Sequence, residues 1–243
     1  MQKQMNSLNI DPVNRERKVL SLLDEWPWEL GGVLIGGYAI AAYGKPRYSD
    51  DVDIVIPSAV LGKMEVFIYG QNFELKNSSV PNPQNYEGKV LRYRTAEMTL
   101  DVLVGYVRDR EARVDIPEPR ISMDHRNLRL ITLTGGTRNK IPIASPEAIW
   151  ALKLQSGRDQ DIIDLFSIFD VKIDGKKVIA LFNDLKSNTL TDKLRKTLQK
   201  THSNKLYEDS MSRLETKRTD KNRKKWVSFG NQVAHIVSGT MKE

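Results

Sequence analysis

The stretch VLIGGYAIAAYGKPRYSDDVDIVIP (Val33–Pro57) decides how this chain folds. It begins with an apolar run that ends in the glycine pair Gly36-Gly37, and it closes with a second apolar run that carries Asp51 and Asp53. Strands are depleted in aspartate, and neighbouring carboxylates repel each other. A strand that keeps acids so close together indicates that something binds between them.

The spacing of the acids indicates a metal site. Side-chain alternation places Asp51 and Asp53 on one face of the strand expected over 52–56, while the apolar residues between them face the other way. Mg²⁺ suits such a pair, because it takes one or two protein carboxylates and completes its shell with water and phosphate oxygens. Asp50 points to the opposite face or into the preceding turn, which makes it a weaker ligand candidate.

A third acid, Asp101, lies within the apolar run MTLDVLVGY, where an unpaired charge is expensive. On a strand next to the first pair, it would complete a three-carboxylate site for two metal ions, of the kind that transfers phosphoryl groups. The alternative is that Asp101 pairs with Arg92 or Arg94 across a hairpin formed by 90–95 and 98–104.

The glycine pair fits the same interpretation. Glycine at a strand-to-helix turn lets the backbone approach a phosphate closely, with amides and a helix N-terminus facing the anion. Gly36-Gly37 alone says little, since any tight turn uses glycine. Followed by Asp-x-Asp on the next strand, the pair predicts a nucleotide site.

The chain divides into a mixed α/β half over 1–144 and a helical half over 145–243. The second half opens with Ser145-Pro146-Glu147, which is a hydroxyl cap, a proline at the first helical position and an acid near the helix N-terminus. Its helices are expected to break near 174–175 and again near 202–204. Elsewhere we expect strands at 33–35, 52–56, 90–95, 98–104, 128–133 and 141–143, helices at 13–26, 38–43 and 58–70, and a polar loop over 76–87.

The composition narrows the setting. The chain has 243 residues and a net charge of +7, with 13 Lys and Arg against 6 Asp and Glu in residues 191–243 and equal numbers before them. A basic face favours nucleic acid, although an ordinary solvated helical surface explains it equally well. The absence of cysteine, of a membrane-length apolar run and of a signal-like N-terminus favours a cytoplasmic protein without a membrane partner.

The glycine pair, thirteen intervening residues and Asp51-Val52-Asp53 together resemble the signature of the DNA polymerase β-like nucleotidyltransferases. The segment GKPRYSDDVD (44–53) is similar to the form found in AbiE-type toxins of that superfamily. The resemblance implies a nucleotidyltransferase fold, with a mixed sheet, flanking helices and a C-terminal helical domain. It also implies that Arg47 and Ser49 bind nucleotide.

The helical half resembles the same branch. SPEAIWALKLQSGRDQDIIDL (145–165) is similar to a later AbiE-type motif, which implies that Lys153 contacts a nucleotide phosphate and that Asp161 or Asp164 completes the site. The alternative is a surface network of Lys–Asp and Arg–Asp pairs. Arg158 and Asp159 lie nearer the helix start and could simply cap it.

These readings imply an enzyme that uses Mg²⁺ at a two-metal site to transfer a nucleoside monophosphate from a nucleoside triphosphate, such as ATP, to a hydroxyl acceptor. One ion would be held by Asp51 and Asp53 and the second shared with Asp101, which could instead act as general base. The acceptor expected first is the tRNA 3′ end, in the role of a toxin with a cognate antitoxin protein. The basic tail, with its aromatic residues Tyr207, Trp226 and Phe229, favours that acceptor.

Three alternatives stay open from the sequence. A small hydroxylated acceptor would make the chain similar to aminoglycoside nucleotidyltransferases, and a protein acceptor is also compatible with the site. The third alternative is a catalytically silent nucleotide or RNA binder. The three retained acids, Asp51, Asp53 and Asp101, argue against it.

Overall fold

Seven strands form one mixed sheet in the order β3-β4-β5-β2-β1-β9-β8. This computed structural model describes residues 11–77, 90–109, 111, 114–182 and 187–242. The strands of the sheet are β1 (Val33–Ile35), β2 (Asp51–Ile56), β3 (Glu74–Asn77), β4 (Val90–Arg94), β5 (Thr99–Val104), β8 (Arg126–Leu128) and β9 (Ile141–Ile143). The expectation of a mixed α/β fold is confirmed, and the strand that carries Asp51 and Asp53 lies at the centre of the sheet.

Two neighbours of β2 fix the position of its acids. β1 runs antiparallel to β2, and β5 runs parallel to it on the other side. The other buried side chains of β2 and β5 are apolar; Asp51 and Asp53 are partly exposed and Asp101 is buried. The central strand therefore carries its carboxylates where a ligand can reach them.

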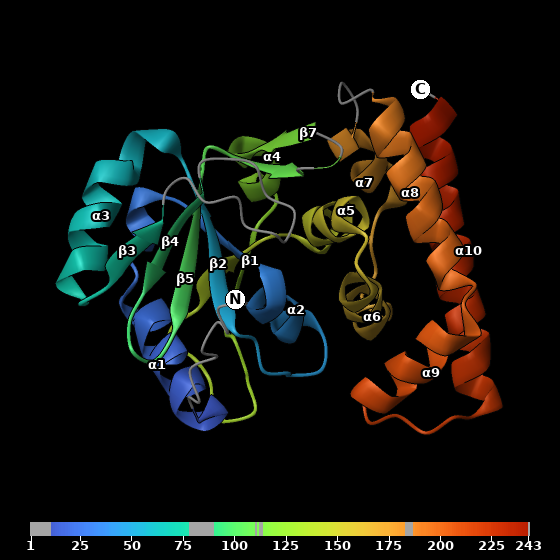
Figure 1. Cartoon of the computed structure of the whole chain (residues 1–243), viewed down its shortest axis with the longest axis horizontal. Helices are drawn as coiled ribbons and strands as arrows, with labels where there is room; N and C mark the ends of the chain where they lie inside the picture. The colour runs from blue at the N-terminus through green and yellow to red at the C-terminus, as the bar shows by residue number, and fades with distance from the viewer. Residues whose placement is uncertain (1–10, 78–89, 110, 112–113, 183–186, 243) are drawn as a thin grey trace, which may run out of the picture.

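Helices cover the sheet and then form a layered group of their own (Figure 1). The helices are α1 (Pro12–Glu25), α2 (Gly36–Tyr43), α3 (Leu61–Gly70), α4 (Glu118–Ser122), α5 (Pro146–Ser156), α6 (Asp159–Ser167), α7 (Gly175–Phe182), α8 (Asn188–Thr201), α9 (Asn204–Arg213) and α10 (Asp220–Lys242). In Figure 1, α5 and α6 lie between the sheet and the outer helices α8 and α10. After residue 144 the described chain is helical, as expected.

The capping signals lie where the sequence placed them. The Ser145 hydroxyl accepts a hydrogen bond from the Ala148 amide at 3.1 Å, so it caps α5. Gly157 ends that helix in the left-handed conformation, with φ of +62°. α7 begins at Gly175 and α9 begins at Asn204, which confirms both expected breaks.

Several expected boundaries were wrong. The strand expected at 128–133 covers only Arg126–Leu128 and continues as a single bridge from Ile131 to Gly136, because the chain turns tightly there. Residues 76 and 77 belong to β3, which pairs with β4; the rest of the loop expected over 76–87 lies outside the described residues. The segment 58–70 begins with a 3₁₀ turn before α3.

A hairpin that we did not predict from the sequence links residues 1–144 to residues 145–243. Its strands are β6 (Tyr106–Asp109) and β7 (Val114–Pro117). Asp109 forms a buried ion pair with Lys193 of α8 at 2.5 Å. A single apolar core runs from the sheet into the helices. Whether 1–144 and 145–243 fold as separate domains stays a prediction.

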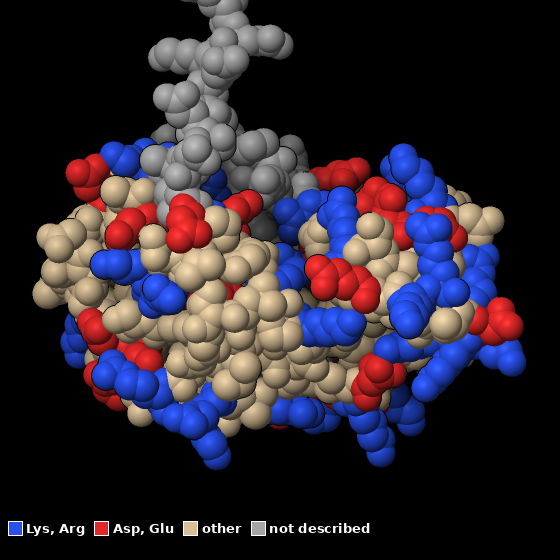
Figure 2. All heavy atoms as spheres, turned by 90° about the horizontal axis from the view of Figure 1, so that it is seen from below, with Lys and Arg blue, Asp and Glu red and all other residues tan. Residues whose placement is uncertain are grey.

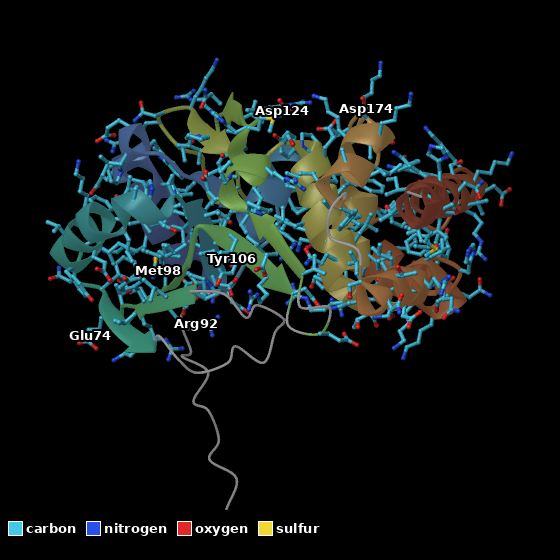
Figure 3. The ribbon with its side chains drawn as sticks, turned by 90° about the horizontal axis from the view of Figure 1, so that it is seen from above. Glu74, Arg92, Met98, Tyr106, Asp124 and Asp174 are labelled. Atoms are coloured by element: carbon cyan, nitrogen blue, oxygen red, sulfur yellow. The ribbon has the colours of Figure 1, made fainter. Side chains whose placement is uncertain are left out.

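A second ion pair, apart from Asp109–Lys193, joins residues 1–144 to residues 145–243. Asp124, which follows α4, pairs with Lys177 of α7 at 2.7 Å. Asp124 lies near Asp174, at the start of the same helix, on one side of the molecule (Figure 3). Both partners of the Asp124–Lys177 pair are about half exposed, so the pair contributes little to stability by itself.

Candidate active site

The register of β2 and β5 assembles three carboxylates. Asp53 pairs directly with Asp101 across the two parallel strands, and Asp51 lies two residues earlier on the same face. One oxygen from each of the three residues can be chosen so that all lie within 4.8 Å of one another. The predicted three-acid cluster is therefore present in the described part of the chain, and it follows from strand pairing alone.

Gly36 makes room for that cluster. It follows β1, whose Ile35 pairs with Asp53, and it has φ of +68°. A Cβ atom at Gly36 would lie 1.9 Å from Oδ2 of Asp53, which is inside the van der Waals contact distance. A Cβ atom at Gly37 would lie 2.4 Å from the Ser49 Oγ. Close approach and the left-handed turn both favour glycine at position 36, whereas only the close approach of Ser49 favours it at position 37.

The acid cluster is electrostatically strained. Burial, followed by the charges of Asp51 and Asp101, raises the pKa of Asp53 well above its ordinary value. Burial and the Asp101 charge also raise the pKa of Asp51. Within the described chain, neither the Asp51 nor the Asp53 carboxylate has a hydrogen-bond or ion-pair partner. A cation bound between them would relieve the repulsion.

Asp101 has a partner, and it is one that the sequence offered as an alternative. Arg92 of β4 donates from Nε and Nη2 to the two Asp101 oxygens, at 2.7 and 2.5 Å. This hydrogen bond raises the pKa of Arg92. Figure 3 shows Arg92 beside β4, away from the helical half. Asp101 thus belongs both to the acid cluster and to a cross-strand ion pair.

Opposite the acids lies a network of cations and carboxylates built by α5 and α6. Lys153 of α5 donates to Asp161 and to Asp164, both at 2.8 Å. Asp164 also accepts two hydrogen bonds from Arg47 at 2.9 Å. Arg158 donates to Asp161 from Nε at 2.8 Å. The network that the sequence offered as an alternative is therefore formed, but it is buried rather than on the surface.

These two aspartates behave in the opposite way to the acid cluster. Burial acts to raise the pKa of Asp161, but the Lys153 ammonium and the Arg158 guanidinium outweigh it and hold that pKa below its ordinary value. Burial also acts to raise the pKa of Asp164, but the charges of Lys153 and Arg47 outweigh it and lower that pKa. Both carboxylates therefore stay ionised and hold their cations in place.

A cavity of about 260 Å³ separates the acid cluster from this network. The structure brings eight of the predicted site residues to its wall, namely Gly36, Gly37, Arg47, Ser49, Asp51, Asp53, Asp101 and Lys153. Asp161 and Asp164 are not on that wall, because they lie buried behind Lys153. In the structure they form ion pairs with Lys153, Arg47 and Arg158, and their part in nucleotide binding stays a prediction.

Four further residues line the cavity that were not singled out as site residues, namely Tyr48, Asp50, Arg158 and Gln160. The sequence predicts Arg158 only as a helix cap. Its backbone amide donates to Asp161 at 3.1 Å, at the start of α6. Gln160 donates to Asp164 at 2.8 Å, and their i, i+4 spacing was the available signal. Asp50 is exposed and pairs with Arg15, so it stays a weak ligand candidate.

The donor set fits a divalent cation. Three carboxylates offer oxygens only, and two of them, Asp51 and Asp53, have no partner among the described residues and have pKa values raised by burial and by neighbouring carboxylates. Oxygen ligands with room for phosphate and water suit Mg²⁺. Asp51, Asp53 and Asp101 are therefore the residues that could hold it.

The aromatic residues of the C-terminal segment are not available for stacking, contrary to expectation. Tyr207, Trp226 and Phe229 are at most 4% exposed and pack in tilted or edge-on contacts with one another and with Phe166. They lie on the apolar faces of α9 and α10, so they form core. The Lys and Arg side chains lie on the outer faces and gather over this end of the molecule (Figure 2).

No family model matches the chain, and no curated protein matches its sequence. Among solved structures, it is similar to ANT(2″)-Ia in complex with adenylyl-2″-tobramycin, with 17% identity over 71% of this chain and 95% of that one and a TM-score of 0.45. It is similar to the lincosamide antibiotic adenylyltransferase LnuA, bound to lincomycin, with 16% identity over 65% and 97% of the two chains and a TM-score of 0.41.

A third similar structure is an antigenic nucleotidyltransferase-like protein from Paracoccidioides brasiliensis. It is 18% identical over 82% of this chain and 93% of that one, with a TM-score of 0.45. Likeness at this level does not transfer an activity. The chemistry of the site therefore has to come from its own residues. No helix in the described ranges has the length and apolarity needed to cross a membrane.

Proposed function

We propose that this protein is an Mg²⁺-dependent nucleotidyltransferase that moves a nucleoside monophosphate from a nucleoside triphosphate to a hydroxyl acceptor. The observation that supports it most is the pairing of Asp53 with Asp101, which brings three carboxylates together. These carboxylates line the same cavity as Lys153 and Arg47. Acids on one wall and cations on the other match a ligand made of metal ions and phosphates.

Asp51, Asp53 and Asp101 would hold the metal. When bound, Mg²⁺ supplies positive charge to the phosphate oxygens and lowers the pKa of a hydroxyl. The partnerless carboxylates of Asp51 and Asp53 are the main ligands. Arg92 donates one hydrogen bond to each oxygen of Asp101, and because each carboxylate oxygen has two lone pairs, Asp101 could keep Arg92 and still act as ligand or as general base.

The groups around the acid cluster would hold the triphosphate. Gly36 and Gly37, at the start of α2, line the cavity beside the acids, and the N-terminus of a helix favours anions. Lys153 and Arg47 line the same cavity and are held by Asp164. Cations fixed in this way neutralise phosphate charge without having to reorganise during the reaction.

The reaction balances as an in-line transfer. The acceptor oxygen forms a bond to the α-phosphorus while the bond from that phosphorus to the β-phosphate oxygen breaks. Pyrophosphate leaves with the electrons of that bond, and the hydroxyl proton passes to solvent or to Asp101. The products are pyrophosphate and a nucleotidylated acceptor.

The acceptor we propose first is nucleic acid, with the tRNA 3′ end as the specific candidate. Support comes from the exposed cations of α8 to α10, such as Lys196, Lys205 and Lys224, at the helical end of the molecule (Figure 2). The AbiE-type resemblance of 44–53 adds the proposal that the enzyme is a toxin with an antitoxin partner. Small hydroxylated molecules and proteins are the competing acceptors.

The test is a labelling experiment. Purified protein is incubated with Mg²⁺, total tRNA and each α-labelled nucleoside triphosphate in turn, and the products are separated on a denaturing gel. We expect label on tRNA from one triphosphate, and none with Asp51→Ala/Asp53→Ala. Tight Mg²⁺-dependent nucleotide binding without labelled RNA would direct the search to small-molecule or protein acceptors. Neither labelling nor binding would refute the proposed function.

A further inference from the structure

A second cavity adjoins the acid-lined one. It has a volume of about 540 Å³ and lies between the loop before β2, helix α6 and the end of α9. Arg47, Tyr48 and Gln160 line both cavities, so these side chains form a shared wall. A cavity of this size is within the range that holds a small molecule or one nucleotide unit.

The shared wall is held in place from behind. Asp164, which is 1% exposed, accepts from Arg47 on one side and from Gln160 at 2.8 Å on the other. Arg213, at the end of α9, donates to the Gln160 side-chain oxygen. The wall therefore connects the acid cluster, the α6 network and the C-terminal helices in one hydrogen-bonded arrangement.

Two cations at this second cavity lack a carboxylate partner among the residues that the structure describes. The Lys45 ammonium donates to the Leu214 carbonyl at 2.8 Å and to the Thr216 hydroxyl at 3.1 Å, both of which are neutral. Arg213 donates only to neutral Gln160, and most of its five N–H groups are available. Of the two lining carboxylates, Asp164 is already shared by Lys153 and Arg47. The other, Glu215, is exposed.

The same cavity also has exposed apolar side chains. Tyr48 is 38% exposed and Leu133 is 55% exposed, and both line it. An aromatic ring beside unneutralised cations suits a nucleotide, because the base stacks on the ring and the phosphate binds the cations. A polycationic acceptor would meet the repulsion of Lys45 and Arg213 instead.

We infer that this second cavity binds a nucleotide unit of the acceptor, with its phosphate at Lys45 and Arg213 and its base against Tyr48 and Leu133. The shared wall at Arg47 then gives the acceptor hydroxyl access to the acid cluster. This inference rests on the proposed function only where it places the acceptor hydroxyl toward the acid cluster. It narrows the acceptor to a nucleic-acid end or a free nucleotide, which carry the same phosphate and base.

The experiment measures binding rather than turnover. A short single-stranded RNA with a free 3′ hydroxyl and a 5′ fluorophore is titrated with protein at several salt concentrations, and its anisotropy is followed. The test variant is Lys45→Gln/Arg213→Gln. The matched control is Lys63→Gln/Lys176→Gln, which removes two exposed cations, on α3 and α7, that form no ion pair within the described ranges. Thermal unfolding confirms that both variants fold.

We expect weaker RNA binding in the test variant, with the slope of log affinity against log salt reduced by about 0.7 for the loss of one neutralised phosphate on a single strand. The control should keep the wild-type slope, and Mg²⁺-dependent binding of a nucleoside triphosphate should be the same in all three proteins. AMP binding as tight as RNA binding would assign the site to free nucleotides. RNA binding much tighter than AMP binding would assign it to a nucleic-acid end.

Two results would overturn the inference. The first is RNA binding that is absent in the wild type, or equal in the test variant and the control. The second is a loss of triphosphate binding in the test variant with RNA binding intact, since the cavity would then belong to the donor. Label transfer is measured separately, so a failure of the proposed function without a change in these binding results leaves the second site standing.

Discussion

The acid cluster of β2 and β5 and the buried network of α5 and α6 face each other across one cavity, yet they are built in opposite ways. Asp51 and Asp53 have raised pKa values and no partner in the described chain. Asp161 and Asp164 have lowered pKa values and are held by Lys153 and two arginines.

The α5–α6 network is neutralised by its own cations, whereas the acid cluster has the charge that the proposed cation would neutralise. A satisfied buried ion pair is usually structural, and losing one partner destabilises the fold. Repulsion between crowded carboxylates without a partner destabilises the folded protein, and a bound cation stabilises it by removing that repulsion. The two regions should therefore respond to mutation in opposite ways.

The largest effect is expected from Asp53→Asn on nucleotidyl transfer. The substitution removes a proposed metal ligand and should lower the rate by about a thousandfold or more, the scale at which charge-stabilising groups act in phosphoryl transfer. It also removes a repelling charge, so the metal-free variant should unfold at the same temperature as the wild type or higher. Rate measurement and calorimetry check the two halves together. A metal-free variant that unfolds well below the wild type would remove the contrast.

Asp161→Ala should act on stability before it acts on chemistry. It leaves Lys153 and Arg158 without their shared carboxylate, at a cost of about 3–5 kcal/mol in the free energy of unfolding. Asp159→Ala is the matched control on the same helix, because its exposed pair with Lys200 contributes about 1 kcal/mol at most. Urea unfolding of both variants measures the difference. Equal losses would show that burial of the network contributes nothing.

Gly36→Ala tests the space beside the acid cluster. A Cβ atom would meet Asp53 at 1.9 Å in a backbone conformation with φ of +68°, so we expect a loss of about 1–3 kcal/mol together with loss of transfer. Gly62→Ala in α3 is the control, since its Cβ atom would meet nothing within 4 Å. That variant should gain about 0.5–1 kcal/mol. A harmless Gly36→Ala would contradict the close approach.

The pH dependence should also divide the two regions. Asp161 and Asp164 have lowered pKa values, so their contribution to stability is present above about pH 4 and is lost as the pH falls through those values. Asp51 and Asp53 have raised pKa values, so the metal-free protein loses stability as the pH rises from about 4 through them.

The stabilisation by Mg²⁺ should accordingly grow with pH over that second window, because the ligands must be ionised. Melting temperatures with and without Mg²⁺ across this range measure it. In Asp53→Asn, the increase in melting temperature caused by Mg²⁺ should no longer grow with pH. The loss of stability at low pH should be the same as in the wild type. A metal effect that stays constant with pH would mean that the ion binds elsewhere.

The parts that the sequence predicted well are those with a short-range cause. Alternation placed Asp51 and Asp53 on one face, and the Ser145-Pro146 cap fixed the start of α5. The pairing of Asp101 with Asp53 could be only an expectation, because strand register depends on residues about fifty positions apart.

The rest depends on long-range packing that periodicity does not report. Arg47 reaches Asp164 across 117 positions of the chain, and no local pattern announces that contact. The expectation for the C-terminal aromatic residues was wrong because a run of basic residues directly precedes Trp226 and Phe229 in α10, and only the packing shows which face is core. The β6–β7 hairpin was missed because its strands are short and separated by charged residues.

The most direct test of the central claim is isothermal titration of a non-hydrolysable nucleoside triphosphate into the wild type and into Asp51→Asn/Asp53→Asn, each with Mg²⁺ and with EDTA. We predict binding only in the wild type with Mg²⁺, because the acids hold the metal and the metal carries the phosphates. Binding of equal strength in EDTA, or in the double variant with Mg²⁺, would contradict the claim that the acid cluster is a metal site for a nucleotide.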